Sequence, residues 1–324
     1  MLQLFNKVWF TGKIPPSWLH SIVAPVPKPN KPAHLPSSYR PISLTSIVCK
    51  LFKKMIVHRL NWFLECHNIL HISQFGFQQR SKTTDHLLHL HDTIHKSMAN
   101  KHNVLSVFIY IEKAYAMVNK EVLLSKLLSY GISDRMFNFI RSFLSNRTFQ
   151  VRIGSTLSMT KRLENGTLQG RVLSPILFSM MINDLPKRIT SHVALCTDDF
   201  WFWECGSDIT LFNQLCQRST KVCKWCEDCG FKLSSTKSAA VLFTRKYNPE
   251  PISLRLQDST RLPLKNEYKY LGLTFQRNRS YSTHIQKVVA KCRARLNVIR
   301  MFKGTSWGAG KRHCLLSIGR WLDL

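Results

Sequence analysis

Acidic residues are scarce in this sequence: 18 Asp and Glu stand against 47 Lys and Arg, and the formal net charge is +29 at pH 7. This shortage indicates a polyanionic partner, because neutralising phosphates and releasing their counterions drives most non-specific binding to nucleic acids. An anionic membrane surface is the alternative. Because 44% of the 324 residues are hydrophobic, the chain can bury a large core, which excludes a disordered basic tail.

Long apolar runs are also missing. No segment approaches the roughly 18 uninterrupted apolar residues that a membrane-spanning helix needs, and Lys7, Lys13 and the pair Pro15–Pro16 interrupt any signal-peptide core. The chain has neither internal repeats nor a low-complexity linker. We therefore expect an intracellular protein of the cytoplasm, the nucleus or both, without a membrane partner and built as one interlocked body.

Paired cysteine spacings of the kind that a disulfide framework needs are absent, so we expect the ten cysteines to be reduced. Cys223, Cys226 and Cys229, with Cys216 upstream, could hold zinc or an iron–sulfur cluster. We favour the alternative, a helix that begins near Asp208 and places Cys226 in the core. Four histidines of another predicted helix lack the H-E-x-x-H arrangement and are attributed to a polar helix face: His86, His89, His91 and His95.

Helix and strand patterns are mixed along the chain, so we expect an α+β fold. The first forty residues, rich in Pro and Lys, are predicted to form extended strands and loops. Helices are predicted at about 46–65, 84–98 and 121–130, and strands at about 104–111 and 148–153. Asp134 is predicted to cap the helix that follows it. The apolar stripe of the first predicted helix consists of Ile47, Leu51, Met55, Ile56, Leu60 and Phe63.

Asp198 and Asp199 are the most informative pair of residues. They stand between an apolar run at 193–195 and an aromatic run at 200–203, a pattern typical of a hairpin with both acids at its tip. Two carboxylates so close repel each other unless a cation neutralises them, and their hard oxygen atoms suit Mg²⁺ that also coordinates substrate phosphates. A solvated turn is the alternative, because Asp is a favoured turn residue.

Further motifs occur on both sides of this pair in a fixed order. Before it come Trp18, Val26 to Pro29, Ser38 to Leu44, Gln74 to Phe77, Ser81 to Thr84, Gly166 to Gly170, Leu173 to Phe178 and Ile182 to Pro186. After it come Gly230 to Lys237 and Tyr268 to Gly272. Together these segments resemble the reverse transcriptases of non-LTR, LINE-like retrotransposons, closest in character to the jockey type. The resemblance favours a catalytic origin of the acid pair over a solvated turn.

The resemblance implies a right-hand polymerase fold that extends a DNA primer on an RNA template with deoxynucleoside triphosphates. The fingers would comprise residues 1–103 and 121–162, the palm residues 104–120 and 163–280, and the truncated start of a thumb residues 281–324. In this chemistry palm carboxylates bind two divalent ions, Mg²⁺ or Mn²⁺, which activate the primer hydroxyl and stabilise the leaving pyrophosphate.

The resemblance also assigns roles to single residues. Asp198 and Asp199 match two of the three metal-binding aspartates, and Tyr115 matches the aromatic residue that discriminates against a ribose hydroxyl. Three further matches concern the incoming nucleotide: Gln169 and Gly170 contact it and Lys237 lies near its triphosphate. Arg40 and Lys28 are candidates for phosphate contacts. For Tyr115 and Lys237 an ordinary strand-end aromatic and a solvated lysine are the alternatives.

The third aspartate is where the sequence departs from the family, because Tyr110 and Ala116 occupy positions at which the family has Asp. A neutral phenol with a pKa near 10 is a poor ligand for Mg²⁺ at pH 7. Glu112 is on the same strand face but about 7 Å further along, too far to replace the missing carboxylate. We therefore expect severely impaired catalysis, and Cys196, where the family prefers an aromatic residue, adds a smaller defect in primer positioning.

The resemblance further implies an endonuclease before the domain and a longer thumb after it, so we interpret the sequence as a truncated, degenerate copy of an element. Three hypotheses follow: a reverse transcriptase domain of weak or no activity, a nucleic-acid-binding protein that keeps only the basic cleft, and a remnant without a present role. Each keeps the charge of +29, which predicts binding to RNA or DNA that weakens as salt rises.

Overall fold

The computed structural model describes residues 1–29, 31–76, 82–167, 172–189, 192–206, 208–245, 254–255 and 261–301. The helices are α1 (Leu2–Thr11), α2 (Pro16–Leu19), α3 (Ile47–Cys66), α4 (Thr83–Ala99), α5 (Ala114–Met117), α6 (Lys120–Ser129), α7 (Asp134–Leu144), α8 (Ser174–Ile182), α9 (Leu185–Ile189), α10 (Asp208–Asp228) and α11 (Ser282–Met301), with a 3-10 helix η1 (Pro36–Ser38). The strands are β1 (His20–Pro27), β2 (Tyr39–Leu44), β3 (Asn103–Tyr110), β4 (Thr148–Ile153), β5 (Thr156–Leu157), β6 (Lys161–Arg162), β7 (His192–Cys196), β8 (Asp199–Gly206), β9 (Ala239–Phe243), β10 (Leu254–Arg255), β11 (Arg261–Leu262), β12 (Glu267–Tyr270) and β13 (Leu273–Gln276).

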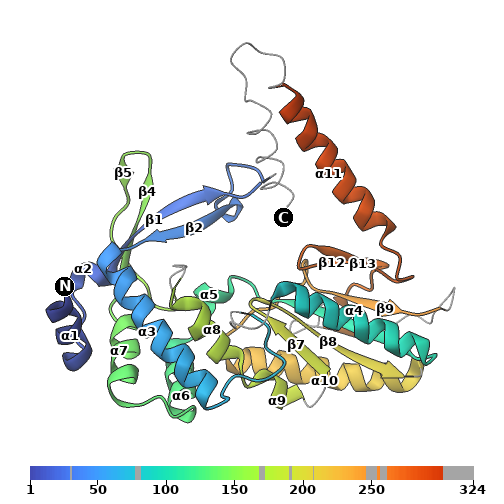
Figure 1. Ribbon diagram of the computed structural model, residues 1–324, viewed down its shortest axis with the longest axis horizontal. Helices are drawn as coiled ribbons and strands as arrows, with labels where there is room; N and C mark the ends of the chain where they lie inside the picture. The colour runs from blue at the N-terminus through green and yellow to red at the C-terminus, as the bar shows by residue number, and fades with distance from the viewer. Residues whose placement is uncertain are drawn as a thin grey trace.

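A four-stranded sheet in the order β7-β8-β3-β9 carries the two acids, and its neighbouring strands are all antiparallel (Figure 1). The apolar sequence of β3 is buried on both faces. Val104 and Phe108 belong to one core cluster together with residues of α4. Leu105 and Val107 belong to a second cluster, which includes residues of α10. Because side chains alternate along a strand, α4 and α10 cover opposite faces of this sheet.

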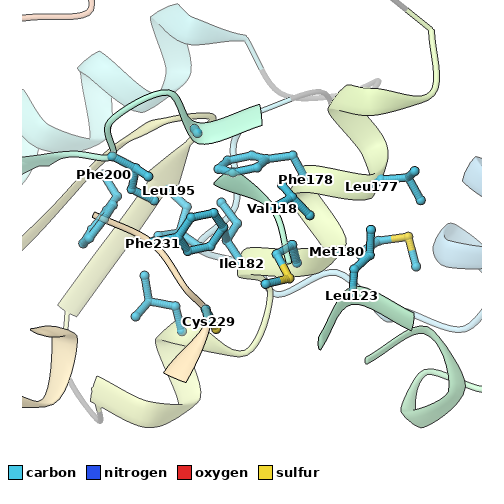
Figure 2. Close-up of a cluster of buried hydrophobic side chains, with 14 of the residues drawn as sticks. Val118, Leu123, Leu177, Phe178, Met180, Ile182, Leu195, Phe200, Cys229 and Phe231 are labelled. Atoms are coloured by element: carbon cyan, nitrogen blue, oxygen red, sulfur yellow. The ribbon is translucent and has the colours of Figure 1, made fainter. Parts of the chain in front are cut away.

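The second core cluster extends from the sheet to α8, as Figure 2 shows. α8 is buried almost all round, which is expected of a helix whose sequence is apolar on every side. Side chains from several elements meet there, among them Val118, Leu123, Leu177, Phe178, Met180, Leu195, Phe200 and Phe231. This packing holds α8, which precedes the acid hairpin, and the segment around Phe231, which follows it, against the first sheet.

A second sheet lies beside the first, with the strand order β2-β1-β4-β5 and β6 paired to β4 (Figure 1). β1 is antiparallel to β2 and parallel to β4. The helices beside this sheet meet in an aromatic cluster centred on Phe52 of α3. The centroid of its ring lies 5.1 Å from that of Phe5, 5.7 Å from that of Trp18 and 5.3 Å from that of Phe139. These rings join α1, α2, α3 and α7 into one support.

The hairpin β12–β13 packs on the first sheet, and α11 extends from it away from the sheet (Figure 1). The rings of Tyr268 and Tyr270 lie 4.7 and 5.0 Å from the ring of Phe108. Within the described ranges, no helix is both long enough and apolar enough to cross a lipid bilayer.

Most of the predicted elements are confirmed. The α+β class, the buried strand near 104–111, the strand 148–153, the hairpin of the acid pair and the helix that begins at Asp208 all occur as expected. The helices predicted near 46–65, 84–98 and 121–130 correspond to α3, α4 and α6 within one or two residues. These elements have strong local signals, namely an apolar period or an unbroken apolar run.

Three predictions about local structure are wrong. The first forty residues begin with a helix, α1, because Phe5 and Val8 give one buried face and Gly12, at φ 65°, ends the helix by bonding back to Val8. Asp134 does not cap α7; it is the first helical residue, and Ser133 holds the capping position. The stripe predicted for α3 also includes exposed residues, namely Ile47, Leu51 and Met55, whereas the buried face consists of Cys49, Phe52, Lys53, Ile56, Leu60 and Leu64.

Candidate functional site

The hairpin of β7 and β8 positions the two adjacent acids. Cys196 pairs with Asp199 at the end of the ladder, so Asp199 is the first residue of β8 and Asp198 lies in the turn. Thr197 takes the left-handed conformation at φ 59° that this tight turn requires, and its hydroxyl donates to Oδ1 of Asp198 at 2.9 Å. The amide of Ile111 donates to the carbonyl of Asp198 at 3.1 Å, which ties the turn to the end of β3.

A segment from far upstream supports this turn. The amide of Phe75 donates to the carbonyl of Leu195 at 2.8 Å, and the amide of Leu195 donates to the carbonyl of Ser73 at 2.8 Å. A Cβ atom on Gly76 would lie 2.9 Å from the amide nitrogen of Thr197. Any larger residue at position 76 would therefore push the turn, which explains the glycine in the motif that begins at Gln74. The motif is recognisable in the sequence, whereas its contact with the acid-bearing turn is visible only in the fold.

Tyr110 ends β3 directly opposite Asp199. The charges of Asp198 and Asp199 both act on the hydroxyl of Tyr110. The ammonium nitrogen of Lys237 lies over its ring, 3.6 Å from the centroid. The acid pair, Tyr110 and Lys237 come from three separate parts of the sequence and form one cluster in the fold.

The pKa values of this cluster are shifted by burial and by the neighbouring charges. Burial raises the pKa of Asp199 to about 7, the charge of Asp198 adds to the rise, and Lys237 opposes it. Burial also raises the pKa of Tyr110 to about 12. The charges of Asp198 and Asp199 add to this rise, and the charge of Arg40 opposes it. Tyr110 is therefore a neutral phenol at physiological pH.

Tyr115 is the second residue of α5 and lies half-buried against α8. Its ring centroid is 5.2 Å from that of Phe178, and burial, followed by the charge of Asp198, raises its pKa to about 12. The amide of Thr167 donates to the carbonyl of Tyr115 at 2.7 Å. Gly166 has φ 86°, and a Cβ atom there would lie 2.5 Å from the carbonyl oxygen of Ala116. The motif that begins at Gly166 therefore passes directly beside Tyr115, while Gln169 and Gly170 lie outside the described residues.

Two basic residues of the β1–β2 hairpin act on the acid cluster: Arg40 on β2 and Lys28, which directly follows β1. Arg40, an exposed residue of β2, exerts its charge on Tyr110. Lys28, whose ammonium group donates to the carbonyl of Ser37 at 2.8 Å, exerts its charge on Lys237. Burial and then Lys28 lower the pKa of Lys237, whereas Asp198, Asp199 and Glu112 raise it. The site is thus acidic on the first sheet and basic on the second.

The donors near the acid pair do not fit two divalent ions. Within the described ranges, no group of three or more His, Cys, Asp or Glu side chains is arranged to hold a metal. Two carboxylates offer the oxygen atoms that Mg²⁺ prefers, but the residue opposite Asp199 in the ladder is Tyr110, a neutral phenol. Glu112 follows the end of β3, and its amide donates to the carbonyl of Lys232 at 2.8 Å.

The cysteine and histidine clusters belong to the packing of the fold. Cys226 and Cys229 are buried in the core and Cys223 is half-buried against it, while the side chain of Cys216 lies outside the described part. The attribution of the four histidines to a polar helix face is wrong for His86, which is buried on the core side of α4 and hydrogen-bonded to the hydroxyl of Tyr270. The ring centroids of His91 and His95 lie 4.1 Å apart in a stacked arrangement.

The acid-bearing antiparallel sheet, flanked by helices and opposed by a basic β unit, has the fold of a right-hand polymerase, and solved telomerase structures share it. Residues 26–275 match the family described as reverse transcriptase (RNA-dependent DNA polymerase), and the chain belongs to this family.

Similar proteins come from insect transposons. The chain is 27% identical over 336 residues to the probable RNA-directed DNA polymerase from transposon BS of Drosophila melanogaster, a match that covers 98% of this chain and 37% of that protein. It is 27% identical over 326 residues to the RNA-directed DNA polymerase from mobile element jockey of the same species, covering 98% of this chain and 34% of that protein. The chain thus resembles a non-LTR reverse transcriptase domain and spans little more than a third of these relatives.

Solved telomerases from Candida tropicalis establish the likeness in fold. The apo enzyme truncated from its C-terminal domain has a TM-score of 0.55 at 14% identity, over 85% of this chain and 58% of that chain. The enzyme in complex with a fragment of telomeric RNA has a TM-score of 0.56 at 11% identity, over 85% of this chain and 47% of that chain.

Proposed function

We propose that this chain is an RNA-directed DNA polymerase domain whose nucleotidyl transfer is severely impaired. The observation that carries the proposal is the position of Tyr110, which ends β3 directly opposite Asp199 in the β3–β8 ladder. It puts a neutral phenol beside the acid pair, at the position where the family has a carboxylate. Losing a group that only supports a metal ligand typically costs about 10–100-fold in affinity or activity, and losing a ligand itself costs more.

The proposed substrates are an RNA template, a DNA primer and deoxynucleoside triphosphates. We assign residues 1–103 and 121–162 to the fingers, 104–120 and 163–280 to the palm, and 281–324 to the start of the thumb. The charge of Arg40 acts on Tyr110 and that of Lys28 acts on Lys237, which supports a basic segment of the fingers facing the acidic palm.

Single residues have proposed roles in the same site. Reverse transcriptases use divalent metal ions, and Asp198 and Asp199 are the two carboxylates of this chain that would contribute to holding them. Tyr115 would discriminate against a ribose hydroxyl, which its half-buried ring beside the Gly166 motif supports. Lys237 would contact the triphosphate. Gln169 and Gly170 would contact the incoming nucleotide, a role that rests on their match to the family alone.

A non-catalytic role in binding nucleic acid is the second candidate. Two observations favour it: the charge of +29 is independent of the acid pair, and the phenol of Tyr110 affects catalysis without removing any basic residue. A chain of this kind would hold RNA or DNA in its basic cleft and leave the primer unextended.

The test is primer extension on an RNA template with Mg²⁺ or Mn²⁺. We compare the unmodified chain with Tyr110→Asp, alone and together with Ala116→Asp. We expect extension only from the restored variants, because Tyr110→Asp returns a third carboxylate to the cluster. Tyr110→Asp combined with Asp199→Asn is the matched control and is expected to be inactive.

Two results would contradict the proposal. Efficient extension by the unmodified chain would show that catalysis is not impaired and that another acid completes the site. If no restored variant extends a primer although each is folded and binds template, the chain is a binding protein rather than a polymerase lacking one ligand.

A further inference from the structure

Two cations are buried together in the helices that support the second sheet, away from the acid cluster. Lys53 lies on α3 and Arg147 lies between α7 and β4, and the two residues are only 4% and 2% exposed. The ammonium nitrogen of Lys53 is 5.4 Å from the ring centroid of Phe143, and the guanidinium carbon of Arg147 is 4.3 Å from the same centroid. Two positive charges therefore share one aromatic ring in the interior of the protein.

Neither cation has an acidic partner within the described ranges, where the ion pairs join other residues. The ammonium of Lys53 has three donors and makes a single hydrogen bond there, to the hydroxyl of Thr45 at 3.5 Å. Nη1 of Arg147 donates to the carbonyl of Phe143 at 3.3 Å, whereas its Nε is buried without a partner. Buried charges are normally paired, so this pair of cations lacks an acceptor of negative charge.

The nearest thiol does not supply that negative charge. Cys49, one helical turn before Lys53, is 1% exposed, and burial raises the pKa of its thiol although the charges of Lys53 and Arg147 act in the opposite direction. The thiol is therefore neutral at physiological pH. Burial lowers the pKa of Arg147 only to about 10, so its guanidinium stays charged. Burial also lowers the pKa of Lys53; Cys49 opposes this shift, and the charges of Arg147 and Lys50 add to it.

The surrounding fold holds both cations in place. The rings of Phe52 and Phe139 lie 5.3 Å apart, centroid to centroid, and pack α3 against α7 (Figure 1). The amide of Leu163 donates to the carbonyl of Arg147 at 2.8 Å, which fixes the chain between α7 and β4. Turning either cation out to water would break this packing, so an anion that enters the site is the less costly way to compensate the charges.

We propose that Lys53 and Arg147 form a binding site for one small monovalent anion of the halide class. The anion accepts hydrogen bonds from Nζ of Lys53 and Nε of Arg147, and its charge offsets the two cations that share the ring of Phe143. A halide suits the site better than an oxyanion such as phosphate, because a larger ion would displace the side chains that bury both cations. The site stabilises the fold and takes no part in nucleotidyl transfer.

Thermal unfolding of the full chain tests the site, with sodium chloride replacing sodium gluconate at constant ionic strength. Gluconate is too bulky to enter a closed site, so chloride is the probe. We expect chloride to raise the melting temperature of the unmodified chain by about 2–4 °C, since an anion that binds only the folded state stabilises it. Lys53→Met should lose this shift. Lys54→Met, which removes an exposed charge from the next position, is the matched control and should keep it.

A second measurement locates the ion in crystals of the full chain soaked in sodium bromide. Bromide substitutes for chloride and scatters X-rays anomalously at the bromine absorption edge. We expect an anomalous peak within hydrogen-bond distance of Nζ of Lys53 and Nε of Arg147. The peak should be absent from crystals of Lys53→Met.

The inference is overturned if chloride and gluconate give the unmodified chain the same melting temperature, which would mean that Lys53 is buried as a neutral amine. It is also overturned if Lys53→Met keeps the full chloride shift. A bromide peak at this position without a chloride shift would show an adventitious ion only. None of these outcomes bears on the proposed function, because the acid cluster is built from other residues.

Discussion

At the scale of single residues, His86 shows how a polar group is carried inside an aromatic core. Its Nε2 lies 2.9 Å from the hydroxyl of Tyr270, and its Nδ1 is buried without a hydrogen-bond partner. The rings of Phe75 and Trp201 surround it, with centroids at 4.8 and 6.4 Å. Burial, followed by the charge of His89, lowers the pKa of His86 to about 3. The folded protein therefore holds this imidazole neutral well below the pH at which the unfolded chain protonates it.

This depressed pKa predicts a loss of stability in acid. His86 gains a proton near pH 6.5 in the unfolded chain and near pH 3 in the folded chain. The contribution of the neutral imidazole to the free energy of unfolding is therefore complete above pH 6.5 and decreases as the pH falls toward 3. At pH 4.5 the loss amounts to about 2–3 kcal/mol from this residue. Denaturant unfolding between pH 7 and 4.5 measures it, and His86→Gln should flatten the dependence.

His58→Gln, which changes an exposed histidine of α3, is the matched control and should leave the pH dependence unaltered. If His86→Gln retains the full slope, the acid sensitivity arises elsewhere, for example at His71 or His89, whose pKa values burial also lowers.

At the scale of elements, one lysine ties three helical segments together behind the sheet. The ammonium of Lys126 on α6 donates to Oδ1 of Asp184 at 2.6 Å and to the carbonyl of Met181 on α8 at 2.7 Å. The indole of Trp225 on α10 donates to the same carboxylate oxygen at 3.2 Å. The two charged side chains are only 14% and 28% exposed, so the charge of each one compensates the other for the hydration that it loses on burial.

Removing one partner of this pair should therefore be costly. We expect Lys126→Met to reduce the free energy of unfolding by about 2–4 kcal/mol, because it leaves a largely buried carboxylate without its cation. Lys96→Met, which breaks the ion pair with Asp92 on α4, is the control. With side chains 75% and 55% exposed, that pair should contribute less than about 0.5 kcal/mol. If the two changes lower the free energy of unfolding in urea equally, the buried ion pair of Lys126 and Asp184 does not stabilise the fold more than an exposed pair does.

At the scale of the whole molecule, charge dominates the expected behaviour. The chain has 47 basic and 18 acidic residues, and Arg40 and Lys28 bring part of that charge opposite the acid cluster. Along α11, which extends from the hairpin β12–β13, the sequence has five basic residues and no acidic one: Lys287, Lys291, Arg293, Arg295 and Arg300. Long-range attraction to phosphates is thus independent of whether the acid pair is competent.

Binding to single-stranded RNA should consequently weaken steeply with salt. For six to ten phosphate contacts, affinity falls by about 10³–10⁵ between 50 and 200 mM salt, and fluorescence anisotropy with a labelled oligonucleotide measures this slope. Tyr110→Asp changes one charge near the acids and should give nearly the same slope. Binding that is insensitive to salt, or absent at low salt, would contradict an electrostatic cleft.

Local sequence signals were sufficient for much of the fold. The runs on either side of Asp198 and Asp199 give the hairpin β7–β8, because strand alternation and a turn between them are properties of the local chain. Tyr110 could likewise be identified as a departure from the family, since its position in a motif needs no coordinates. The order of the motifs along the chain was sufficient to indicate the family.

The sequence by itself determined where the acid hairpin, β3 and α3 lie along the chain, and which charge dominates. Only the tertiary structure decided which face of α3 is buried, since both of its faces carry apolar residues and contact with Phe5 and Phe139 selects that of Phe52. It also decided that Ser238 holds Tyr110 across 128 residues of chain. The physical reason is that spacing specifies hydrogen bonds within an element, whereas contacts between distant segments depend on how the elements pack.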